Sequence, residues 1–144
     1  MKLLCVAFAV VLGVSSKSFH ANLGPEMACL KEQNLTLKDV FPYVHIVSDV
    51  NNEVVGRYLE CVWKKWNILT SNGNVSGADI YKYLTNIYHN ANLTENNKQE
   101  MRDASNKCAK VTDQSEWILA NKVKNCIIKA VNEMPFLTQP KPHN

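Results

Sequence analysis

The sequence predicts an all-α fold, a compact bundle of about six short helices. The stretch 52–69 carries apolar side chains at steps of three and four, which form one broad helical face between acid–base pairs at i,i+4 spacing. The residues of this face are Val55, Tyr58, Leu59, Val62, Trp66 and Leu69. Only five glycines and five prolines occur, too few for the turns of a β-sandwich or barrel. We therefore expect 52–69 to be the central helix, with the other segments packed around it.

The first residues have the pattern of a secretory signal rather than of a folded element. Lys2 precedes an apolar run from Leu3 to Val14, and Ser15 and Ser16 supply small residues at a cleavage site. We expect cleavage after Ser16, with Ala21 as an alternative, so that 1–16 is a signal peptide and 17–144 one domain. No later stretch has the ~20 apolar residues of a membrane helix. The exported product carries mixed charges without a basic block, which argues against nucleic acid or anionic membrane as a partner.

Four cysteines remain after Cys5 leaves with the signal: Cys29, Cys61, Cys108 and Cys126. An even number in an oxidising compartment predicts two disulfides, and three connectivities are open. No CxxC pair occurs, which argues against a zinc or thiol site, and we expect no metal and no cofactor.

In the first half of the chain, helices are expected over 25–33, with Pro25 at its first position, and from Thr36 to Pro42, which should end it. The connector 43–47 should pack on the core. Either Asn51 or Asn52 then caps the central helix.

The second half predicts three more helices, each with a start signal. Ser76 caps one that follows a stop at Gly73, Thr94 caps a polar one that runs to Lys110, and Asp113 with Glu116 forms a capping box for the last. Asn34, Asn74 and Asn92 begin glycosylation motifs, but each motif contains an expected helix cap, and we favour the capping role. Phe136 and Leu137 form an apolar pair after the last helix, and this pair either folds back over the bundle or frays.

The cysteine frame resembles that of the insect odorant-binding proteins, pheromone-binding proteins included. That family has six cysteines, and Cys29, Cys61, Cys108 and Cys126 match the first, third, fourth and sixth. Arg57 and Trp117 stand in the second and fifth slots, so the chain resembles the four-cysteine "Minus-C" subclass. The resemblance implies the bridges Cys29–Cys61 and Cys108–Cys126. It also leaves the central and last helices without their usual bridge, so that packing must substitute, with Trp117 as a candidate.

The resemblance implies a non-enzymatic, secreted carrier of small hydrophobic ligands such as odorants or pheromones, held in an apolar cavity. The fluid would be sensillum lymph or haemolymph, and an olfactory receptor or a second copy of the chain are the protein partners it suggests. Apolar and aromatic residues on the inward faces are the candidate ligand contacts, although plain core packing explains each one about as well. These candidates are Phe41, Val47, Tyr58, Val62, Trp66, Tyr83, Leu84, Ile87, Tyr88, Met101, Trp117, Ile118, Phe136 and Leu137.

The sequence leaves two alternative functions, an amine scavenger and a helical cytokine. A salivary scavenger of biogenic amines would need a carboxylate facing the cavity, and the inward faces contain none. A helical cytokine would need longer helices with crossover connections. Four scattered histidines, His20, His45, His89 and His143, give weak support for a pH switch.

Overall fold

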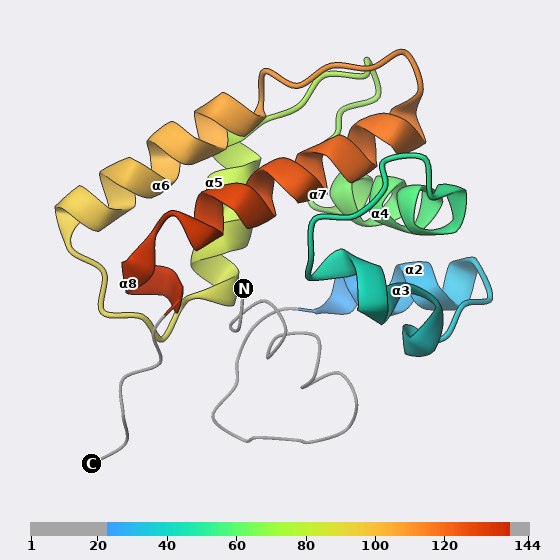
Figure 1. Ribbon diagram of the computed structural model, residues 1–144, viewed down its shortest axis with the longest axis horizontal. Coiled ribbons are helices and arrows are strands. Elements are labelled where there is room, and N and C mark those ends of the chain that lie inside the picture. The colour runs from blue at the N-terminus through green and yellow to red at the C-terminus, as the bar shows by residue number, and fades with distance from the viewer. Residues whose placement is uncertain (1–22, 139–144) are drawn as a thin grey trace.

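The computed structural model describes residues 23–138, and the part described is helical (Figure 1). Its helices are α2 (Gly24–Glu32), α3 (Leu37–Val44), α4 (Glu53–Lys65), α5 (Gly77–Ile87), α6 (Glu95–Cys108), α7 (Glu116–Asn132) and α8 (Pro135–Thr138). Within 23–138 the only β-type pairing is an isolated bridge between Leu69 and Val75. The all-α prediction is confirmed, and the predicted signal peptide lies outside the described residues.

The predicted caps start the helices where the sequence places them. The side chains of Asn52, Ser76 and Thr94 accept hydrogen bonds from the backbone N–H three residues on, at the starts of α4, α5 and α6. At α3, the Asp39 carboxylate accepts from the backbone N–H of Thr36 at 2.7 Å. Thr36, Ser76 and Thr94 therefore have the capping role that the sequence favoured for them.

The ends of α4 and α3 differ from the prediction. The central helix α4 ends at Lys65 rather than Leu69, because Asn67 adopts a left-handed conformation (φ 61°) and the Ile68 N–H turns back to the Trp63 carbonyl at 2.8 Å. Pro42 does not end α3. The helix continues to Val44, whose fully buried side chain packs in the core.

The predicted capping box of the last helix is also wrong. Ser115, not Asp113, is the N-cap of α7. Asp113 lies in the preceding turn, where its carboxylate accepts from the Ser115 N–H at 2.9 Å and pairs with Lys122 at 2.8 Å. Asp113 therefore stabilises the turn that precedes α7 and not the first turn of the helix.

Helix α7 runs through the length of the bundle (Figure 1). Its first half packs on α4, with α2 and α3 on the side of α4, while α5 and α6 pack together near its second half. The short α8 returns onto α7 and buries Leu137 completely. The apolar pair Phe136 and Leu137 therefore folds back over the bundle and does not fray. The connector 43–47 is only partly packed, since Tyr43 and Val47 are exposed.

Two disulfides close the bundle as the resemblance implied. Cys29 joins α2 to Cys61 of α4, and Cys108 at the end of α6 joins Cys126 of α7. Neither bridge connects α4 to α7.

Close packing and polar contacts hold α4 against α7 instead. Gly56 permits the approach: a Cβ atom there would lie 2.7 Å from the Trp117 ring and 2.7 Å from its carbonyl oxygen. The Trp63 ring N–H donates to the Ala120 carbonyl at 3.1 Å, and Lys64 pairs with Glu116 at 2.7 Å. Trp117 therefore takes part in the substitute for the missing bridge, as expected.

The loop between α3 and α4 is also bound to α7, by a buried lysine. The Lys124 side chain is 2 % exposed, and its ammonium group donates to the carbonyls of Tyr43 (2.9 Å) and Ile46 (2.7 Å) and to the Ser48 hydroxyl. Burial lowers the Lys124 pKa to about 8. The ammonium form of Lys124 still predominates at neutral pH. Backbone oxygens accept the hydrogen bonds that water would accept at the surface.

Candidate ligand-binding site

Most of the predicted ligand contacts are in the core. The fully buried ones are Tyr58, Val62, Tyr83, Leu84, Ile87, Tyr88, Met101 and Leu137, and the partly buried ones are Phe41, Trp66, Trp117, Ile118 and Phe136. Val47 is different: it lies in the loop after α3 with 45 % of its surface exposed. Its inward orientation was predicted from an apolar run that has no helical periodicity, and the structure does not place it with the others.

The enclosed space among these residues is small. A cavity of about 10 Å³ lies between α4, α5 and α7, and three of the predicted contacts, Tyr58, Val62 and Tyr83, line it. Its other lining residues are Val44, Leu59, Trp63, Lys124, Ile127 and Ile128. Such a volume holds about one water molecule. The aromatic rings therefore fill most of the interior that the resemblance implied would be open.

A larger hollow, of about 680 Å³, lies open to solvent along the seam between α6 and α7. Its floor is apolar, formed by Ala104, Val111, Ala130 and Met134 beside the second disulfide, and its rim carries charges of both signs. None of the predicted ligand contacts lines this groove.

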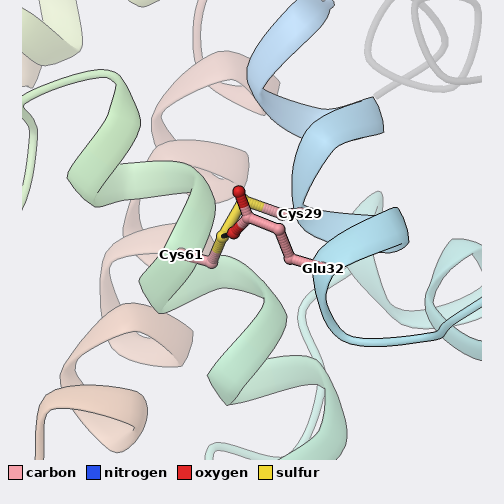
Figure 2. A group of neighbouring side chains, drawn as sticks. All are labelled: Cys29, Glu32 and Cys61. Carbon is pink, nitrogen blue, oxygen red and sulfur yellow. Dashed lines mark hydrogen bonds between the residues drawn. A yellow bond between two sulfur atoms is a disulfide. The ribbon is translucent and has the colours of Figure 1, made fainter.

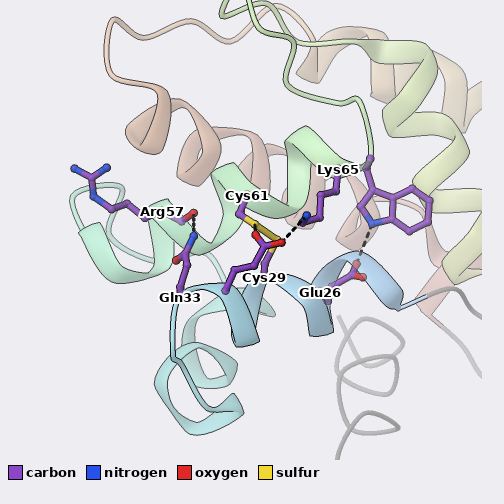
Figure 3. The surroundings of a disulfide bond; sticks show 8 residues. Glu26, Cys29, Gln33, Arg57, Cys61 and Lys65 are labelled. Carbon is purple, nitrogen blue, oxygen red and sulfur yellow. Dashed lines mark hydrogen bonds and ion pairs between the residues drawn. A yellow bond between two sulfur atoms is a disulfide. The ribbon is translucent and has the colours of Figure 1, made fainter.

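The core contains a carboxylate that the sequence reasoning missed. Glu26 of α2 is 2 % exposed, and its Oε1 accepts a hydrogen bond from the Trp66 ring N–H at 3.2 Å (Figure 3). Its Oε2 is buried with no hydrogen-bond partner. Burial raises the Glu26 pKa to about 7, and the bond from Trp66 opposes that rise. The expectation that no carboxylate faces inward is wrong.

Three tyrosines lie around this carboxylate and in the adjoining core. The hydroxyls of Tyr58 and Tyr88 are buried without a partner. Burial raises the pKa of Tyr58 and of Tyr83, and the negative charge of Glu26 raises both further. The Tyr83 ring meets the Trp63 and Trp66 rings edge-on, with centroids 5.1 and 5.5 Å apart.

A sequence signal for Glu26 exists. It stands three residues before Cys29 and four before Leu30, so a helix places it on the same face as two core residues. The segment GPEMACLKE has almost no amphipathic pattern, so periodicity alone does not mark the inward face of α2.

One cluster in the described residues has the composition of a metal site, and its chemistry argues against that role. Cys29, Glu32 and Cys61 come together on α2 and α4 (Figure 2), but the two sulfurs are bonded to each other and are not thiolates. Glu32 pairs with Lys65 at 2.9 Å, and its contact with the Cys61 sulfur at 3.4 Å is not a hydrogen bond, because a disulfide sulfur carries no hydrogen.

The histidines do not gather at the interior site. His45 packs its ring on Phe41, with centroids 4.8 Å apart, and His89 is exposed after α5. His20 and His143 lie outside the described residues.

No helix in the range 23–138 is both long and apolar enough to cross a membrane. A search of curated proteins finds no match to this sequence. A comparison with protein-family models matches residues 23–130 to the PBP/GOBP family, whose members are carriers of small ligands. That match covers all the helices from α2 to α6, most of α7 and all four bridged cysteines. On this extent of similarity, the chain belongs to the PBP/GOBP family.

Proposed function

We propose that the protein is a secreted carrier of small hydrophobic ligands, such as odorants or pheromones, and that the ligand enters the core between α4, α5 and α7. The observation that carries this placement is a group of unpartnered polar atoms in the core: Glu26 Oε2 and the hydroxyls of Tyr58 and Tyr88. An unpartnered buried polar group costs about 1–3 kcal/mol. A ligand with one polar group would recover part of that cost.

The core has the composition of a ligand pocket although it is nearly closed. Pockets for small molecules are apolar and aromatic, with a few polar groups that set orientation. Tyr83, Trp63 and Val62 supply the walls here. Because the present space is about 10 Å³, rings must move before a ligand can enter. Burial of its apolar surface, at about 25 cal/mol per Å², would drive that rearrangement.

The absence of a bridge between α4 and α7 fits this mechanism. The described residues hold two disulfides, Cys29–Cys61 and Cys108–Cys126, and the contacts between α4 and α7 are non-covalent. Helices joined this way can separate by small amounts and adapt to ligands of different shape. We therefore expect broad binding at micromolar level rather than strict selectivity.

The α6–α7 groove is the competing location, and a displacement experiment separates the two. N-phenyl-naphthylamine, an uncharged fluorescent probe, is bound to the protein and displaced by a panel of alcohols, aldehydes, esters and ketones. Ile127→Ala enlarges the interior cavity, whereas Ala130→Trp fills the groove. With the ligand in the interior, the first variant binds small panel members at least about threefold more tightly, because less of the core must be displaced. The second changes affinity by less than about twofold.

Loss of displacement in Ala130→Trp, with no change in Ile127→Ala, would move the site to the groove. Failure of every panel member to displace the probe from the unmodified protein would refute the carrier function itself.

A further inference from the structure

We propose that the exported chain carries N-linked glycans on Asn34, Asn74 and Asn92, three exposed asparagines that begin Asn-X-Ser/Thr motifs. This inference goes beyond ligand binding, and it rests on the export that the proposed function includes. A chain that enters the secretory compartment meets a lipid-linked oligosaccharide pyrophosphate, the donor that modifies such motifs. All three motifs lie in connections between helices, where a bulky group can project into solvent.

The three motifs share one arrangement of side chains. In each, the asparagine is exposed, the middle residue is partly buried against the core, and the hydroxyl residue is the N-cap of the next helix. The middle residues are Leu35, Val75 and Leu93. An apolar side chain directly before an N-cap anchors the chain where it enters the helix. The anchored middle residue thus fixes each connection with its asparagine on the outer side.

Helix capping accounts for the last residue of each motif but not for the first. The hydroxyl residues cap α3, α5 and α6, as the sequence favoured. Asn34 has a separate structural reason, since its backbone is left-handed (φ 55°) and asparagine tolerates that conformation. Asn74 and Asn92 are not left-handed, and within 23–138 their side-chain amides form no hydrogen bond. Capping and glycosylation do not compete, because they use different residues of the motif.

The turn at Asn74 shows how the fold presents such an amide. The Asn74 backbone N–H donates to the Thr70 hydroxyl at 3.2 Å, and its carbonyl accepts from the Thr70 N–H at 2.9 Å. Val75 then pairs with Leu69 in the isolated bridge. The backbone is therefore held at both ends of the turn while the side chain faces solvent. None of the three asparagines lines the interior cavity or the α6–α7 groove, so the modified positions lie outside both.

The modification joins the asparagine side chain to a sugar. The amide nitrogen bonds to the anomeric carbon of the first sugar, and the bond from that carbon to the pyrophosphate oxygen breaks. The lipid pyrophosphate leaves, and the amide loses one proton. The transferring enzyme binds the motif in an extended chain and contacts its hydroxyl. In the folded protein the Ser76 hydroxyl donates to Asp79 at 2.6 Å, and that of Thr94 accepts from the Asn97 N–H at 3.1 Å. Transfer therefore precedes formation of the caps.

Site mapping by mass spectrometry tests the proposal. The full chain with its own leader is expressed in insect cells. Protein from the medium is treated with a peptide-N-glycosidase that accepts core-fucosylated glycans, in water enriched in heavy oxygen. The enzyme converts each modified asparagine to aspartate and places the heavy oxygen there. We expect this label at Asn34, Asn74 and Asn92, with a fall in intact mass that corresponds to three glycans. An asparagine without the label is contradicted as a site.

Asn90 and Asn92 form a matched pair in the loop between α5 and α6. Both are exposed, and only Asn92 begins a motif. Asn92→Gln should lower the mass of the secreted protein by one glycan, whereas Asn90→Gln should leave the glycan mass unchanged. Thr94→Ser keeps a hydroxyl in the motif and should keep the glycan. Loss of a glycan in Asn90→Gln, or no loss in Asn92→Gln, would contradict modification at Asn92.

A stability measurement separates the motif from the cap. Thr94→Ala removes both, and Asn92→Gln removes the motif alone. In protein made with an inhibitor of glycosylation, Thr94→Ala should unfold at a lower urea concentration than the unmodified chain, because α6 loses its N-cap. Asn92→Gln should unfold at the same concentration as the unmodified chain. A lower midpoint for Asn92→Gln would give this asparagine a structural role and remove the argument for a glycan there.

The outcomes distinguish this proposal from the carrier function. Secreted protein with no label at any of the three asparagines would refute glycosylation and leave the carrier function intact. Labelled protein from which no ligand displaces the fluorescent probe would support glycosylation and refute the carrier function. Protein that stays in the cell with its leader uncleaved would contradict export, and with it the premise of the glycans.

Discussion

At the scale of single residues, the buried carboxyl group of Glu26 makes the unfolding free energy depend on pH. Its pKa is about 7 in the folded protein against an ordinary 4.5, so between these values the folded state holds a proton that the unfolded state has lost. The contribution of Glu26 to stability is therefore greatest below pH 4.5 and falls as pH rises through 7, by a total of about 3 kcal/mol. Glu26→Gln removes this dependence.

Urea unfolding of the two proteins between pH 4.5 and 8 measures the effect. The curves of unfolding free energy should converge at the acid end and separate toward pH 8, with the variant more stable. Glu32→Gln, at the surface, serves as the control and should follow the unmodified protein. Parallel curves for Glu26→Gln and the unmodified protein would show that Glu26 keeps its ordinary pKa.

Lys124 is the second residue whose burial has a measurable consequence. Lys124→Met keeps the length and apolar stem of the side chain but leaves the carbonyls of Tyr43 and Ile46 without their donor. We expect a loss of about 2 kcal/mol in unfolding free energy, since the lost bonds outweigh relief from a buried charge. Chemical denaturation measures it, with exposed Lys129→Met as the control. Equal or greater stability of Lys124→Met would mean that the cost of burying the ammonium dominates.

At the scale of helices, the contact of α4 with α7 depends on Gly56. Alanine there would gain up to about 1 kcal/mol in helix propensity. Its Cβ would lie 2.7 Å from the Trp117 carbonyl oxygen, a backbone atom that cannot rotate away. Gly56→Ala should therefore destabilise the protein by about 1–3 kcal/mol through overpacking, measured by thermal or urea unfolding. Exposed Val54→Ala on the same helix should change stability by less than about 0.5 kcal/mol. A gain in stability for Gly56→Ala would show that the two helices can move apart freely.

The disulfide of α6 has a different role, because α6 is the polar outer wall. Removal of the bridge by Cys108→Ser with Cys126→Ser should lower the unfolding free energy by about 3 kcal/mol, since it closes a loop of 18 residues. Hydrogen exchange should rise most in α6, whose buried side is limited to Met101, Ser105 and Cys108. Uniform exchange across all helices would instead indicate a global effect.

At the scale of the whole molecule, the starts of the helices could be predicted and several of their ends could not. A cap such as Ser76 or Thr94 is a local signal, readable from a few residues. Asn67 ends α4 by adopting a left-handed backbone conformation, which is open to asparagine but not required of it. Pro42 is tolerated within α3 because core packing holds the helix beyond it. Such ends are decided by tertiary contacts.

The candidate site was predictable in its apolar part only. Tyr58, Val62 and Tyr83 lie on helical faces whose periodicity marks them as inward, and they do line the cavity. Glu26 was missed because a charged residue in a short helix is ordinarily solvent-facing, and its burial depends on Trp66, forty positions away. The small volume of the cavity follows from ring packing, which periodicity does not encode.

The placement of the two disulfides has a consequence for the integrity of the chain. Each bridge lies wholly on one side of the Thr70–Asn74 turn, one before it and one after. A protease that nicks this turn would leave two separately cross-linked fragments, associated only by side-chain contacts. Under denaturing, non-reducing conditions the pieces would come apart, and on dilution they could reassemble by complementation.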